Sequence, residues 1–72
     1  MIFLNDLRRE VLAGNSVEHP WELFRLANFP GRDHDEAVAE LGQWAQDNGI
    51  EIEFGERQLR SLPVIYILFK ER

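Results

Sequence analysis

The residues best suited to chemistry are acidic, and they are concentrated between Asp33 and Phe54. This stretch holds seven carboxylates and no lysine or arginine. By contrast, four acids balance four arginines in the first 32 residues, and two acids accompany four basic residues in the last 18. The formal net charge of −5 is therefore gathered in one part of the chain. Such an asymmetry is typical of a surface that attracts a basic partner.

Three of these carboxylates, Glu36, Glu40 and Asp47, recur at helical spacing, and we call them the acidic stripe. On a helix that turns about 100° per residue they share one face. The opposite face is apolar and consists of Ala37, Val38, Leu41, Trp44 and Ala45. Glu51 and Glu53 follow on the next segment and could extend the acidic field.

The acidic stripe has three interpretations. It is a solvated face whose first-turn acids complement the helix dipole, or it docks onto a basic protein. In the second case carboxylates roughly 6 Å apart along the helix replace the phosphates of a nucleic acid. Metal binding is the third interpretation, but Asp33, Asp35 and Glu36 match no calcium-loop spacing. We therefore expect no metal site.

Other reactive residue types form no recognisable site. The chain has no cysteine, and His19 and His34 have no second ligand at metal-binding spacing. Ser16 and Ser61 are not in a nucleophile elbow. The sequence therefore predicts that the chain is not an enzyme and needs no cofactor.

A helix and two strands must position the acidic residues. Asp33 is a good helix N-cap, Glu36 can complete a capping box, and Asn48-Gly49 is a typical helix end. The alternation from Ile50 to Phe54 predicts a strand with one buried face, and the apolar run from Val64 to Phe69 predicts its antiparallel partner. The loop from Gly55 to Leu62, which carries Arg57 and Arg60, is long for a hairpin.

The first 32 residues predict two more helices. One lies near residues 5 to 13, with a short strand over Met1–Leu4 as an alternative for its start. The other begins with Pro20 in its first turn and stops at Phe29-Pro30. Its buried face would hold Trp21, Leu23, Phe24 and Ala27, and Leu26 falls off that face.

The fold class predicted is α+β, with three helices followed by a C-terminal antiparallel hairpin in a single domain of residues 1–72. This order resembles the winged-helix domains, a helix-turn-helix followed by a two-stranded wing. The resemblance covers most of the chain and implies the architecture alone. A core this small is marginal on its own, so a partner would help the domain to fold.

The strand from Val64 to Phe69 is apolar on both faces, although a sheet covered on one side needs only alternate apolar positions. Either the amino-terminal segment covers the second face, or that face is an interface. In the second case Ile65, Ile67 and Phe69 form an exposed patch that mediates a homodimer or receives a partner.

The leading functional hypothesis is a small acidic adaptor or inhibitor that binds a basic protein, a profile common among phage and mobile-element inhibitors. Its binding residues would be Glu36, Glu40, Asp47, Glu51, Glu53, Ile65, Ile67 and Phe69. The alternatives are a transcription regulator that contacts DNA through Arg57 and Arg60, which ranks lower because the third helix lacks cations, and a structural subunit of a larger complex. With neither a signal peptide nor a membrane span in the sequence, we expect a cytoplasmic protein.

Overall fold

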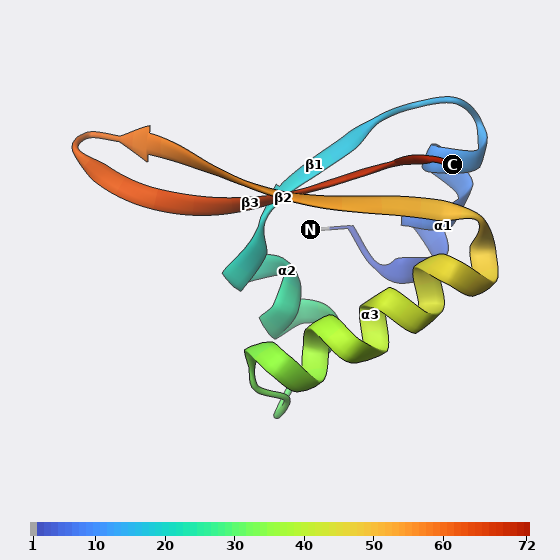
Figure 1. Ribbon diagram of the computed structural model, residues 1–72, viewed down its shortest axis with the longest axis horizontal. Helices are drawn as coiled ribbons and strands as arrows, with labels where there is room; N and C mark the ends of the chain where they lie inside the picture. Colours follow the sequence, from blue (N-terminus) through green and yellow to red (C-terminus); the bar gives the residue numbers. More distant parts are fainter. Residues whose placement is uncertain (1) are drawn as a thin grey trace.

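Three helices pack on one face of a three-stranded antiparallel sheet in the computed structural model, which describes residues 2–72 (Figure 1). In chain order the elements are α1 (Leu4–Leu12), β1 (Val17–Pro20), α2 (Trp21–Asn28), α3 (His34–Asn48), β2 (Ile50–Leu59) and β3 (Leu62–Glu71). The strand order is β1-β3-β2. We call the sheet face that meets the helices the inner face and the opposite one the outer face. The predicted α+β class is confirmed.

Helix α3 forms as its sequence predicts. The Asp33 side chain accepts a hydrogen bond from the Glu36 backbone N–H at 2.8 Å, and the Glu36 carboxylate accepts one from the Asp33 N–H at 3.2 Å. This capping box satisfies two amides of the first turn. The helix ends at Gly49, whose φ of 67° is readily adopted by glycine.

The amino-terminal half contains a strand that the sequence analysis missed. Strand β1 pairs with β3, with Val17 opposite Phe69 and Pro20 opposite Tyr66. It is only four residues long and has a single strongly apolar residue, so it carries no periodic signal. The alternative strand over Met1–Leu4 is wrong for the described residues, since Ile2 and Phe3 lie in no strand and Leu4 begins α1. Met1 lies outside the described residues.

The predicted loop from Gly55 to Leu62 is wrong, because the two strands continue through it. Strands β2 and β3 pair from Ile50 opposite Glu71 to Leu59 opposite Leu62. The turn is Arg60-Ser61, with φ values of 51° and 67°. Left-handed conformations at both central residues match the natural twist of a hairpin. The hairpin therefore projects beyond the helices, as its orange and red-orange ribbon shows in Figure 1.

Aromatic side chains of α2 fill the inner face of the sheet. The Phe24 ring lies 5.1 Å from that of Phe69, and the Trp21 ring stands edge-on to that of Phe54 at 5.2 Å, centroid to centroid. Leu7, Val11, Leu41, Ile50 and Ile67 complete the core. The prediction that Leu23 is buried is wrong, since 56% of it is exposed, whereas Leu26 lies off the buried face as expected.

A hydrogen bond connects the start of α2 to the start of α3. The indole N–H of the buried Trp21 donates to Nδ1 of His34 at 2.9 Å. The two rings also meet edge to face, with centroids 5.7 Å apart. His34 therefore links the start of α3 to the buried indole of α2.

Replacing His34 by alanine should destabilise the protein by about 1 kcal/mol, because the indole N–H of Trp21 loses its acceptor. The variant His34→Asn is the matched control, since the asparagine oxygen can take the place of Nδ1. Urea unfolding followed by tryptophan fluorescence measures both. Equal stability of the alanine variant and the wild type would show that the bond contributes nothing.

Candidate functional site

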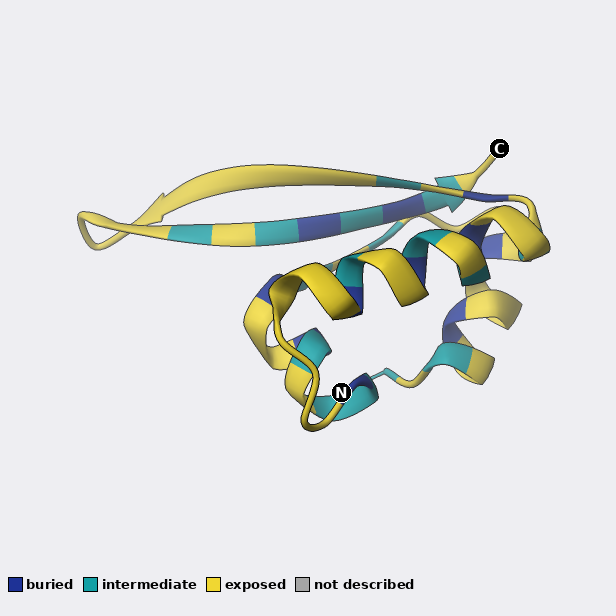
Figure 2. Ribbon diagram, turned by 60° about the horizontal axis from the view of Figure 1, so that its bottom comes forward, coloured by how far each residue is buried: buried dark blue, intermediate teal, exposed yellow. Residues whose placement is uncertain are grey.

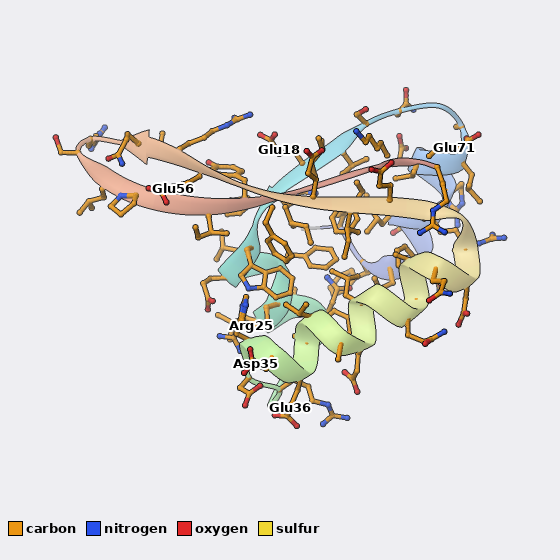
Figure 3. The ribbon with its side chains drawn as sticks, in the orientation of Figure 1. Glu18, Arg25, Asp35, Glu36, Glu56 and Glu71 are labelled. Carbon is orange, nitrogen blue, oxygen red and sulfur yellow. The ribbon has the colours of Figure 1, made fainter. Side chains whose placement is uncertain are left out.

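The acidic stripe lies on the exposed face of α3. Glu36, Glu40 and Asp47 are all exposed, whereas Ala37, Leu41 and Ala45 on the other side are buried. Figure 2 shows this division along the helix. In Figure 3 the side chain of Glu36 points away from the sheet. The helix thus turns its negative side outward.

The chain neutralises only part of the stripe. Arg32 Nε lies 3.2 Å from the Glu40 carboxylate, and this pair is exposed to solvent. Glu36 is bonded to the Asp33 backbone, and Asp47 accepts a hydrogen bond from Gln43 at 2.9 Å. Within residues 2–72, neither Glu36 nor Asp47 forms an ion pair. The stripe therefore keeps most of its charge.

Glu51 and Glu53 do not extend the stripe. They alternate with Ile50 and Ile52, whose side chains pack on the inner face, so they lie on the outer face of the sheet. The ammonium group of Lys70 on β3 lies 3.5 Å from the Glu53 carboxylate. The protein therefore has two acidic areas, one on the exposed side of α3 and one on the outer face of the sheet.

The exposed apolar patch predicted on β3 is wrong for Ile67 and Phe69. Both are fully buried, because the helices cover the inner face. Only Ile65, which lies beyond the helices and is 43% exposed, remains available to a partner. The outer face is half-buried at Val64, Tyr66 and Leu68.

Some apolar residues of the hairpin other than Ile65, Ile67 and Phe69 are exposed. Phe54 is 40% exposed and Leu59 is 49% exposed on β2, and Leu62 on β3 is also exposed. The sequence does not reveal them, because the alternation from Ile50 to Phe54 places Phe54 on the buried face and the predicted loop contains Leu59 and Leu62. Leu59 and Leu62 stand opposite each other at the end of the hairpin, and this pairing becomes visible only once the strands are known to be long.

The two hairpin arginines have different surroundings. The Arg57 guanidinium forms an ion pair with Glu18 of β1 and lies 4.9 Å from the centre of the Tyr66 ring. Arg60 occupies the turn and is exposed. Of the two, Arg60 is the one whose charge is directed to solvent at the hairpin tip.

A shallow hollow lies on the outer face beside Arg57. Its volume is about 250 Å³, and Glu18, Glu53, Tyr66 and Leu68 contribute to its lining. Gly55 stands opposite Tyr66 and leaves the space above it open. Because ligand sites usually measure about 300–1,000 Å³ and enclose their ligand, this open hollow is smaller than a typical small-molecule site.

Titratable groups of β1 and α2 have shifted pKa values. Burial lowers the pKa of His19, which stacks near Phe24. The hydrogen bond from Arg25 lowers the pKa of Glu22 and raises that of Arg25 itself. In the part of the chain that the structure describes, no three His, Asp or Glu side chains converge as metal ligands. No helix there is both long enough and apolar enough to cross a membrane.

Comparisons with protein-family models, with curated proteins and with solved structures find no match to this chain.

The lowered pKa of His19 predicts a pH dependence of folding. Because the folded state binds this proton less readily than the unfolded state, stability is complete above the ordinary value of 6.5 and falls as the pH decreases below it. Urea unfolding at about pH 7.5 and about pH 5.5 measures the loss. His19→Gln should show a smaller loss between these pH values. If His19→Gln loses as much stability as the wild type between these pH values, the pH dependence comes from other groups.

Proposed function

We propose that this chain is a small protein-binding module of winged-helix-like shape, an adaptor or inhibitor that meets a basic surface of another protein through α3. The order of elements supports the shape, because α2 and α3 follow each other through a short turn and the β2–β3 hairpin comes next. The observation that carries the function is the outward-facing acidic stripe on the helix that would otherwise read DNA.

Electrostatics favours a protein partner over DNA at this helix. Phosphate neutralisation by lysine and arginine supplies much of the affinity for DNA, and α3 contains neither residue. The carboxylates of Glu36, Glu40 and Asp47 instead spread negative charge over about 16 Å of helix, at a rise of about 1.5 Å per residue. Such a row attracts a cationic surface at distances up to the Debye length of about 8 Å. The stripe would therefore steer and orient the partner.

The partner proposed is a protein whose basic surface serves to bind nucleic acid. Carboxylates one helical turn apart, as in Glu36 and Glu40, lie about 6 Å apart along the axis. They would take the place of successive phosphates on that surface. The exposed Ile65 of the hairpin would add contact area that salt does not screen.

Reversing the stripe should slow association with the partner and flatten its dependence on salt. The test variant is Glu40→Lys with Asp47→Lys, and Glu36 is left unchanged because it closes the capping box. The control is Glu10→Lys with Glu71→Lys, which changes the net charge equally at exposed sites outside the stripe.

The partner is first identified by purifying the tagged chain from its native host and analysing what copurifies. Association rates of both variants are then measured at several salt concentrations. Equal rates for stripe variant, control and wild type would remove the proposal. A loss confined to the stripe variant supports it.

DNA binding through the hairpin is the second candidate, favoured by the exposed Arg60 at the tip of a wing-like hairpin. A gel-shift titration at low salt tests it with random-sequence duplex DNA. If the hairpin binds DNA, the wild type gives a retarded band, and this band is lost when Arg57 and Arg60 are changed to alanine. If wild type gives no retarded band, the hairpin arginines do not bind DNA.

A further inference from the structure

Strand β2 has a free edge. It is the last strand in the order β1-β3-β2 and pairs with β3 along its whole length of ten residues. Within residues 2–72, no backbone hydrogen bond joins β2 to any segment other than β3. A long strand edge of this kind is a template for pairing with another strand.

The hairpin register shows which backbone groups lie at this edge. A two-residue turn closes on a hydrogen-bonded pair, here Leu59 and Leu62. Bonded and non-bonded pairs then alternate, so the odd-numbered residues of β2 bond to β3. The even-numbered residues direct their N–H and C=O groups outward. Beyond Ile50, which is buried at the start of the strand, these are Ile52, Phe54, Glu56 and Gln58.

The other sheet edges are blocked, and that of β2 is not. Strand β1 is four residues long and ends at Pro20. Beyond β1, the edge of β3 carries Pro63, which stands opposite Gln58 in a pair that is not hydrogen-bonded. The proline nitrogen therefore lies on the unpaired side of β3, where it offers no donor. Strand β2 contains no proline, so it alone presents a continuous row of donors and acceptors.

The charges along β2 complement those of a second copy. On the outer face, Glu51 and Glu53 lie on one side of Gly55, and Arg57 lies on the other. An antiparallel pair of β2 strands related by a two-fold axis near Gly55 places each Arg57 opposite an acid of its neighbour. A parallel pair would place like charges together. Opposite charges across strands stabilise a pair, and like charges destabilise it.

We infer that the β2 edge pairs antiparallel with the β2 edge of a second copy, joining two three-stranded sheets into one of six strands. The two-fold axis makes the interface self-complementary. The new strand also covers part of Phe54 and Leu59, which the monomer leaves 40% and 49% exposed. The acidic stripe on α3 takes no part in this pairing, so the inference extends beyond the proposed function.

Two charge variants and their mixture test the pairing. One variant is Arg57→Glu, and the other combines Glu51→Arg with Glu53→Arg. Each alone places like charges across the two-fold axis and should weaken the dimer about tenfold. An equimolar mixture restores opposite charges and should recover dimers. Sedimentation equilibrium at low salt, up to millimolar protein, measures the association.

Arg60→Glu is the matched control, because it changes the charge equally at the turn and should leave the dimer intact. Circular dichroism checks that each variant folds, since Arg57→Glu also loses its ion pair with Glu18. Amide hydrogen exchange gives a second readout in the wild type. Ile52, Phe54, Glu56 and Gln58 should become more protected as the protein concentration rises.

Three results would each overturn the inference. The first is a wild type that stays monomeric at millimolar concentration. The second is a dimer that Arg57→Glu and Arg60→Glu weaken equally. The third is exchange at the four outward-facing amides of β2 that does not change with concentration.

Discussion

The packing of Trp21 and Phe24 against the sheet is the contact on which the rest of the structure depends. Both rings come from α2, a helix of only eight residues. Phe24 meets Phe69 of β3, Trp21 meets Phe54 of β2, and the Trp21 indole is bonded to His34 at the start of α3. Each aromatic pair of this kind contributes about 0.5–1.5 kcal/mol of stability beyond the contribution of the apolar area that it buries. One short helix therefore fixes both strands of the hairpin and the helix that carries the acidic stripe.

The packing of these rings on the inner face determines which way the carboxylates of β2 and α3 face. Because the inner face is filled by rings, Glu51 and Glu53 must lie on the outer face, and α3 must turn Glu36 and Asp47 toward solvent. The exposed ion pairs at Glu40 and Glu53 contribute at most about 1 kcal/mol each. Within the stripe, Glu36 stabilises the start of α3 through the capping box, whereas Glu40 and Asp47 contribute little to folding and are free to serve an interaction.

The sequence predicts α3 well, because Asp33, Glu36 and Gly49 act locally through capping and a left-handed residue. It also predicts the outward side of α3, which follows from helical spacing. It does not reveal β1, whose four residues become a strand only through pairing with β3. Nor does it reveal that Ile67 and Phe69 are core, since a strand that is apolar on both faces does not show which face the helices cover. The separation of Glu53 from the stripe likewise requires the layer order.

The length of the hairpin is not apparent from the sequence, and the reason differs from that for β1. Arg60-Ser61 lacks the Asn-Gly signature of a two-residue turn, and charged residues beyond Gly55 suggest a loop. From Gly55 to Tyr66 no residue is buried. Ordering the backbone of this segment costs about 1–2 kcal/mol per residue, and burial in a core does not offset that cost. Its support within residues 2–72 comes from the ladder of backbone bonds and from Arg57 against Glu18 and Tyr66. This distal half of the hairpin is therefore the part of the molecule that gains most from a neighbouring strand.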